Sequence, residues 1–125
     1  MQSFLNLIDL STGRQVRLAE FGFEASSPSF CEDGVSFERG GSEWLFDLST
    51  GLIKKRGETS TRSDCVSDVK LNFISELENG FGHCELIAHG KVIARFMGSE
   101  KSLGAVPEKD GKVVFIGYPS PEGIN

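Results

Sequence analysis

Polar and apolar residues alternate along several segments of the chain, and this period of two residues is the main structural signal in the sequence. Segment 69–77 places Leu71 and Phe73 on one face of a strand and mostly polar residues on the other. Segments 42–48 and 91–97 alternate in the same way. No long run shows apolar residues at the helical spacing i, i+3, i+4, i+7 between caps. The pattern therefore predicts an all-β fold.

Short turns that contain glycine separate the predicted strands. Tight hairpins need positive φ angles, which glycine adopts without the strain that a Cβ atom causes. The sequence Asp-Leu-Ser-Thr-Gly occurs twice, at 9–13 and 47–51. At both places we expect a type I turn followed by a left-handed glycine that forms a bulge.

These turns recur at a nearly constant interval. Gly13, Gly51 and Gly90 follow one another at steps of 38 and 39 residues, and Gly41 and Gly80 are also separated by 39. Different turn positions that share one register indicate an internal duplication. The sequence thus predicts three repeats of about 38 residues, each with four strands.

The whole chain, 1–125, is predicted to form a single all-β domain. Its complete unit, 28–56, contains the predicted strands 28–32, 35–39, 42–48 and 52–56. The unit 66–97 contains two strands within 66–77, followed by 81–88 and 91–97. A split unit combines 103–109 and 112–118 with 4–10 and 14–20. Pairing of these terminal strands would close the structure without a free edge.

Part of the sequence is similar to a known repeat. Segment 27–51, SPSFCEDGVSFERGGSEWLFDLSTG, resembles one blade of a WD40-type or TolB-type β-propeller. The resemblance extends over 5–56 and 105–117, where the chain ends look like the end and the beginning of a blade. It implies a propeller-like binding platform and transfers no catalytic residue.

The number of units departs from that family, because propellers usually have four to eight blades. Three units also fit a β-trefoil, a prism or a β-sandwich. Alternatively, two chains could complete a six-bladed ring. Both a monomer and a homodimer are therefore open.

Charge and cysteine content limit the classes of partner and the cellular compartment that we expect. The formal net charge of −5 argues against nucleic acid, which needs clustered cations, and is compatible with a basic protein partner. Three cysteines without regular spacing favour a reducing compartment. The N-terminus lacks the basic start of a signal peptide, and no segment approaches the roughly 20 apolar residues of a membrane helix. We expect a soluble, cytoplasmic protein with no membrane contact.

Few residues in the sequence suggest a catalytic or ligand-binding site. Cys84 and His83 are adjacent, so on a strand they point to opposite faces, whereas His89 across a turn could approach Cys84. A small enzyme using Cys84 and His89 is one alternative. A carbohydrate-binding lectin is another, although Trp44 and Tyr118 occupy non-equivalent positions in the repeats. The spacing fits no structural zinc site and no phosphate loop is present, so we predict no catalytic residue, cofactor or metal.

The connections between units are the best candidates for function, since loops on a rigid β scaffold commonly carry it. Segments 20–27, 57–68 and 97–104 should emerge on one side of a closed repeat. Together they supply six carboxylates and two possible aromatic anchors: Glu20, Glu24, Glu58, Asp64, Asp68 and Glu100, with Phe21 and Phe23. Alternatively, the two phenylalanines seal the core and are not anchors for a partner.

These features favour a non-catalytic protein-binding module. In general character, although not in any motif, the chain resembles small bacterial immunity proteins and antitoxins, which cover the active site of a toxin. That resemblance implies an acidic loop face that docks on the basic cleft of a nuclease-like toxin domain.

Overall fold

The computed structural model describes residues 2–32, 34–57, 68–78, 80–100 and 104–119, which form three antiparallel four-stranded sheets. Sheet A has the order β11 (Glu108–Lys109), β12 (Lys112–Gly117), β1 (Ser3–Asp9) and β2 (Gln15–Phe21). Sheet B has the order β3 (Ser26–Phe30), β4 (Gly34–Arg39), β5 (Ser42–Asp47) and β6 (Ile53–Gly57). Sheet C has the order β10 (Gly104–Ala105), β7 (Lys70–Glu78), β8 (Phe81–Ala88) and β9 (Lys91–Ser99). The all-β prediction is confirmed.

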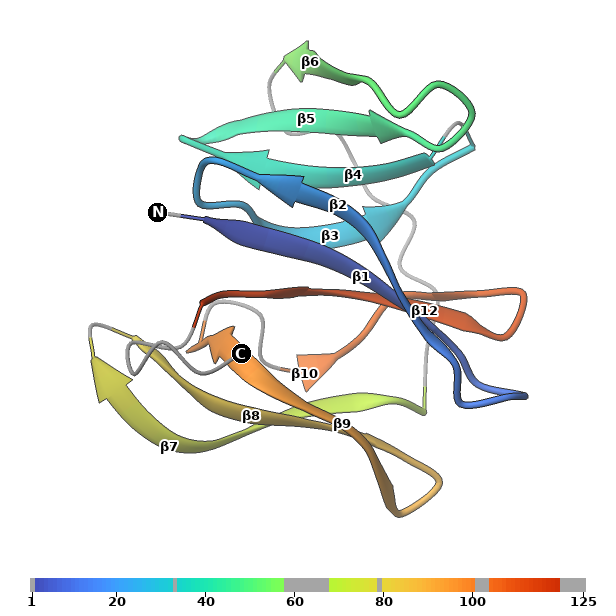
Figure 1. Cartoon of the computed structure of the whole chain (residues 1–125), viewed down its shortest axis with the longest axis vertical. Helices are drawn as coiled ribbons and strands as arrows, with labels where there is room; N and C mark the ends of the chain where they lie inside the picture. Colours follow the sequence, from blue (N-terminus) through green and yellow to red (C-terminus); the bar gives the residue numbers. More distant parts are fainter. Residues whose placement is uncertain (1, 33, 58–67, 79, 101–103, 120–125) are drawn as a thin grey trace.

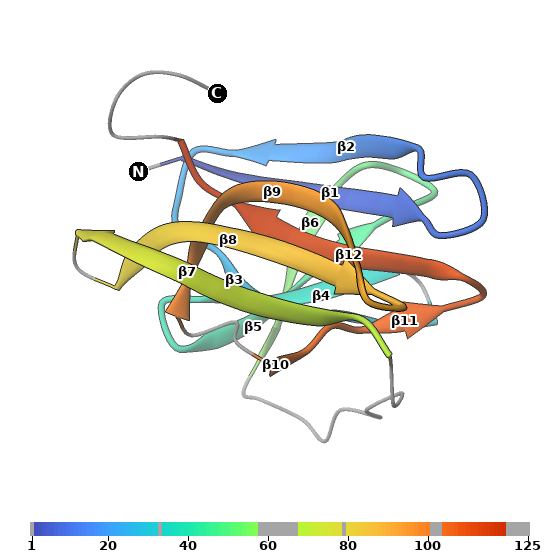
Figure 2. The ribbon, with the colours of Figure 1, turned by 90° about the horizontal axis from the view of Figure 1, so that it is seen from below.

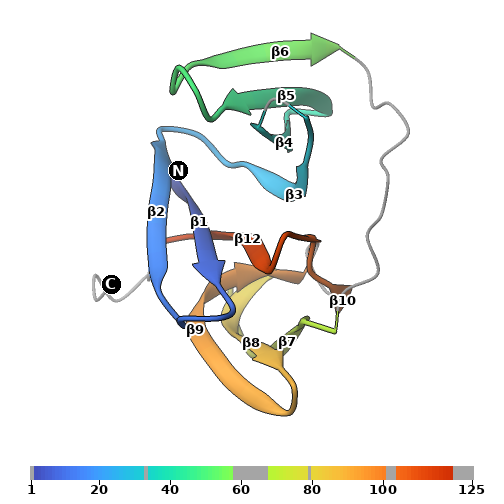
Figure 3. The same cartoon turned by 90° about the vertical axis from the view of Figure 1, so that its right-hand side faces the viewer.

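The sheets form three layers, with sheet A between sheets B and C (Figures 1 and 3). In sheet A, β12 pairs antiparallel with β1, and Leu5 lies opposite Ile116. Residues from both ends of the chain therefore meet in one sheet, as the sequence predicted. The strands of sheet B also follow the predicted order, with boundaries shifted by a few residues.

Two strand predictions need correction. Within the described part of 66–77 the structure has one strand, β7, and the neighbouring position in sheet C is occupied by β10. The predicted strand 103–109 is divided between β10 in sheet C and β11 in sheet A. Pro107 lies in the gap between them, where its missing N–H cannot interrupt a ladder.

Each Asp-Leu-Ser-Thr-Gly segment forms a turn that its aspartate organises. Asp47 Oδ1 accepts hydrogen bonds from the Ser49 amide at 2.8 Å and from the Ser49 hydroxyl at 2.7 Å. Asp9 makes the same two bonds with Ser11, at 2.9 and 2.6 Å. Gly13 and Gly51 both have φ of 73°, which confirms the predicted left-handed position. The repeated motif therefore encodes two turns with the same hydrogen bonds.

Four of the hairpin turns gather at one end of the molecule. We call this the turn end; it holds the turns at Gly13, Gly51, Gly90 and Gly111, on the right in Figures 1 and 2. The opposite end, the connection end, holds the chain after β2, after β9 and after β12. The Tyr118 amide donates to the Met97 carbonyl at 2.9 Å, which joins β12 to β9 at the connection end.

Two core clusters lie on the two faces of sheet A, and β12 contributes to both. Val114 and Ile116 pack in the cluster shared with sheet B, which also contains Phe21 and Phe37. Val113 and Phe115 pack in the cluster shared with sheet C, which also contains Leu71 and Leu86. Because alternate side chains of a strand point to opposite faces, one strand holds the three layers together.

The Asp47 turn predicts an acid-dependent contribution to stability. The bonds from Ser49 lower the pKa of Asp47 below its ordinary value of 3.8, so the carboxylate stabilises the fold above that pH. This contribution disappears as the pH falls through the folded-state pKa. We expect urea unfolding to show Asp47→Asn less stable than the wild type at pH 7, with the difference shrinking towards pH 3. The control Asp110→Asn, in a turn with positive φ that Asn tolerates, should change the stability little at pH 7. A pH-independent difference at Asp47 would contradict this account.

The double burial of β12 predicts a large cost for truncating it. Phe115 is 2% exposed, and its ring centroid lies 4.5 Å from that of Phe96. We expect Phe115→Ala to lower the free energy of unfolding by about 3–5 kcal/mol, measured by denaturant titration. The control Val92→Ala, at a side chain that is 44% exposed on β9, should change it by less than about 0.5 kcal/mol. Similar losses for both variants would be inconsistent with a core role for β12.

Candidate functional site

Buried hydrogen bonds hold the connection from β2 to β3 in place. The Ser3 hydroxyl donates to the Phe23 carbonyl at 2.7 Å and accepts from the Ala25 amide at 3.3 Å. The Tyr118 hydroxyl donates to the Ala25 carbonyl from the other side, and burial raises the pKa of this phenol, which keeps it a donor. Sheet A and the chain after β12 therefore fix where Phe23 lies.

Phe23 is the outer ring of an aromatic stack. Its ring lies 4.9 Å from Phe21 with planes 13° apart, and Phe21 lies 4.8 Å from Phe37 in sheet B. Phe21 is 2% exposed and belongs to the core, whereas Phe23 is half-buried. Of the two predicted aromatic anchors, only Phe23 presents surface to a partner.

Arg39 lies between two aromatic side chains. Its guanidinium carbon is 3.8 Å from the ring centroid of Phe23 and 5.1 Å from that of Trp44. We call these three residues the arginine clamp. Such cation–π contacts contribute about 0.5–2 kcal/mol each and restrict the arginine to one place. The clamp is therefore a rigid, half-buried group at the connection end.

Local pairing explains how the clamp forms. Gly40 and Gly41, with φ of 58° and 81°, make the tight turn between β4 and β5. That turn sets Arg39 opposite Ser42 and Phe37 opposite Trp44, so Arg39 and Trp44 share one face of sheet B. The sequence prediction did not include Arg39 or Trp44 in the binding site. The sequence feature that could have revealed them is the glycine pair Gly40-Gly41, because a tight turn there fixes the register of Arg39 and Trp44.

Three predicted carboxylates, Glu20, Glu24 and Glu100, lie exposed at the connection end. Glu20 Oε1 accepts a hydrogen bond from the side-chain nitrogen Nε2 of Gln2 at 3.4 Å. Glu24 is close enough to Tyr118 for its charge to contribute, after burial, to the raised pKa of that phenol. The Glu100 amide donates to the Gly80 carbonyl at 2.9 Å beside the start of β8. The connection end thus combines carboxylates with the arginine clamp.

Asp68 lies elsewhere. It precedes β7, whose first residue pairs with Ile87 near the turn end of sheet C. Glu100 follows Ser99, which pairs with Phe81 at the other end of the same sheet. The strand direction therefore separates Asp68 from Glu100 by the length of β8, contrary to the expectation of one shared side. The predicted residues Glu58 and Asp64 lie outside the described residues.

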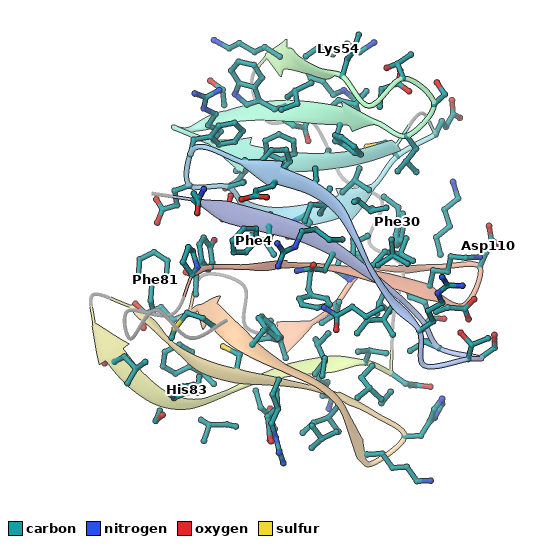
Figure 4. The ribbon with its side chains drawn as sticks, in the orientation of Figure 1. Phe4, Phe30, Lys54, Phe81, His83 and Asp110 are labelled. Carbon is teal, nitrogen blue, oxygen red and sulfur yellow. The ribbon has the colours of Figure 1, made fainter. Side chains whose placement is uncertain are left out.

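The geometry around Cys84 disfavours nucleophilic chemistry. Cys84 is 1% exposed, and burial raises the pKa of its thiol to about 11. His83 points away from the core on the opposite face of β8 (Figure 4). His89 lies in the turn beyond β8, five residues along an extended strand, which corresponds to roughly 16 Å. Neither histidine is placed to take a proton from Cys84.

The aromatic residues considered for a sugar platform are largely engaged. Tyr118 is 5% exposed, its ring lies 4.9 Å from Phe81, and its hydroxyl is bonded to Ala25. One face of Trp44 is covered by Arg39. This arrangement leaves Tyr118 without an open ring face on which a sugar could stack.

Within the described ranges, no group of three or more His, Cys, Asp or Glu side chains is arranged to hold a metal ion. The same part of the chain contains no helix long and apolar enough to cross a membrane. No family model, curated protein or solved structure matches the sequence or the fold.

The raised pKa of Cys84 predicts an unreactive thiol. At pH 8 we expect iodoacetamide to alkylate Cys84 far more slowly than Cys31, which is half-buried, because almost all of the Cys84 thiol is protonated. Peptide mapping by mass spectrometry separates the two sites. In urea both cysteines should react at similar rates. Fast alkylation of Cys84 in the folded protein would instead support an activated nucleophile.

Proposed function

We propose that this protein is a non-catalytic protein-binding module that uses its connection end to bind a basic partner. The specific form we propose is an immunity- or antitoxin-type inhibitor that covers the active site of a nuclease-like toxin domain. We place it in the cytoplasm, consistent with the free cysteines Cys31 and Cys84. The arrangement that carries the proposal is the arginine clamp together with the exposed carboxylates Glu20, Glu24 and Glu100 at the same end of the molecule.

Each part of this surface has a role in binding. Exposed carboxylates attract a basic cleft and raise the association rate. Arg and Trp are the residue types that most often dominate interface energies, especially when they are rigid and half-buried before binding. The clamp meets that condition because Phe23 and Trp44 already restrict Arg39. A partner would lose little free energy in ordering it.

The proposal includes a propeller-like architecture. The three sheets have equal strand numbers, and the split sheet A contains strands from both chain ends, which is how propellers close. Repeats of about 38 residues with turns at a shared end are consistent with this arrangement. In propellers the loops at one end form the binding platform, which agrees with placing the site at the connection end.

Charge reversal tests the proposal. The protein is co-expressed with the product of the adjacent gene, and we expect a tight one-to-one complex in which the toxin activity is blocked. The triple variant Glu20→Lys, Glu24→Lys, Glu100→Lys should weaken that complex by about 100-fold or more, measured by calorimetry. Asp68→Lys, at the turn end, is the matched control and should change the affinity by less than about threefold.

The outcomes are distinct. Equal weakening by Asp68→Lys would move the binding surface away from the connection end. Unchanged affinity in the triple variant would remove the proposed site. A protein that neither binds nor inhibits the neighbouring product would contradict the inhibitor function itself.

A further inference from the structure

Strand β6 forms the outer edge of sheet B, and every described side chain on it is exposed. Among the strands that the structure describes, β6 pairs only with β5. It is the uppermost strand in Figures 1 and 3, and Lys54 extends from it into the space above the sheet in Figure 4. The edge is therefore accessible along its length.

The register indicates which backbone groups of β6 face outward. At the β5–β6 turn, the Asp47 amide donates to the Leu52 carbonyl at 2.9 Å, so this pair points inward. Because pairs alternate in an antiparallel ladder, Lys54 also points towards β5, opposite Leu45. Ile53 and Lys55 then direct their N–H and C=O groups away from the sheet. These groups are the template for another strand.

The side chains along this edge give it a charge opposite to that of the whole protein. Lys54, Lys55 and Arg56 are consecutive in a chain with a formal net charge of −5. Arg56 Nη1 also donates to Cys31 Sγ at 3.0 Å, which holds that side chain next to β3. That bond directs Arg56 back across the sheet, so an approaching strand would meet Lys54 on one face of the edge and Lys55 on the other.

An apolar group lies at the start of the same strand. Leu52 is 68% exposed, Leu48 49% and Ile53 39%. They occupy the β5–β6 turn and the first position of β6, next to the cations. Along the edge, an apolar contact at Leu52 and Ile53 is thus followed by the positive charges of Lys54 and Lys55, and unpaired backbone groups of Ile53 and Lys55 face outward.

A second copy of this chain fits the edge poorly in the register centred on Lys55. Antiparallel pairing of two β6 strands about Lys55 would place Lys55 against Lys55 and Lys54 against Arg56. Like charges directly opposite each other destabilise a strand pair. An acidic strand has the complementary charge.

We propose that the β6 edge binds an acidic, extended peptide segment by strand addition, with an apolar side chain of that segment against Leu52. The backbone of the segment pairs with Ile53 and Lys55, and its carboxylates pair with Lys54 and Lys55. Lys55 pairs with the clamp residue Trp44, so the two surfaces are neighbours, but strand addition at β6 does not depend on the function proposed for the connection end.

A defined peptide tests the proposal. The probe is a fluorescein-labelled peptide in which Glu alternates with Thr and Leu stands at each end, and its binding is followed by fluorescence anisotropy at low salt. The double variant Lys54→Glu, Lys55→Glu should bind it at least tenfold more weakly. Lys91→Glu on β9 is the matched control, because Lys91 is also an exposed strand lysine; it should bind like the wild type.

A backbone variant separates strand addition from simple charge attraction. Lys55→Pro removes an outward N–H without breaking the ladder to β5. It should bind at least tenfold more weakly than Lys55→Ala, which removes the same charge and keeps the N–H. Circular dichroism checks its fold, and a probe with Pro at its centre gives the same test on the wild type. Equal binding of the Pro-containing probe would overturn strand addition.

Two other results would also overturn the proposal. Absence of binding at millimolar probe would mean that the lysines only protect the edge from aggregation, which is a common role for edge lysines. Concentration-dependent dimerisation of the wild type by light scattering, abolished by Lys55→Pro, would make a second copy the occupant.

Discussion

The burial of β12 on both faces is the constraint on which the rest of the structure depends. Its side chains alternate between the two core clusters, Val114 and Ile116 on one side and Val113 and Phe115 on the other. A strand that is buried on both faces reads as a continuous apolar run, here Val-Val-Phe-Ile. Since β12 also pairs with β1, the two ends of the chain must come together before either cluster is complete.

Local signals in the sequence predicted the parts of the fold that short turns determine. The β3–β6 meander follows from turns at Gly34, Gly41 and Gly51, each of which sets the register of its neighbours. The position of β10 could not be predicted in this way. It has only two residues, and it pairs with β7, more than 30 positions earlier in the chain. Pairing over that distance depends on tertiary packing, which periodicity does not report.

The same distinction between local and long-range signals explains which residues of the candidate site could be predicted from the sequence. Glu24 and Glu100 lie in exposed connections as predicted, because polar segments between strands must reach the surface. Glu20 is exposed too, but it belongs to strand β2, where it pairs with Phe4. Asp68 was assigned to the same side although the direction of β7 places it at the other end. Arg39 was missed because its position depends on two contacts at once: the register with Trp44 in its own sheet, and Phe23 arriving from sheet A.

The two proposed surfaces differ in how closely they are tied to the fold. The connection end shares Phe21 and Phe37 with a core cluster, so changes near the arginine clamp alter packing as well as binding. Neither core cluster includes a described residue of β6. An edge that carries charge and backbone groups but little core can change its partner without loss of the fold. The carboxylates at the connection end share that freedom, whereas the aromatic residues beside them pack against the core and cannot change without altering it.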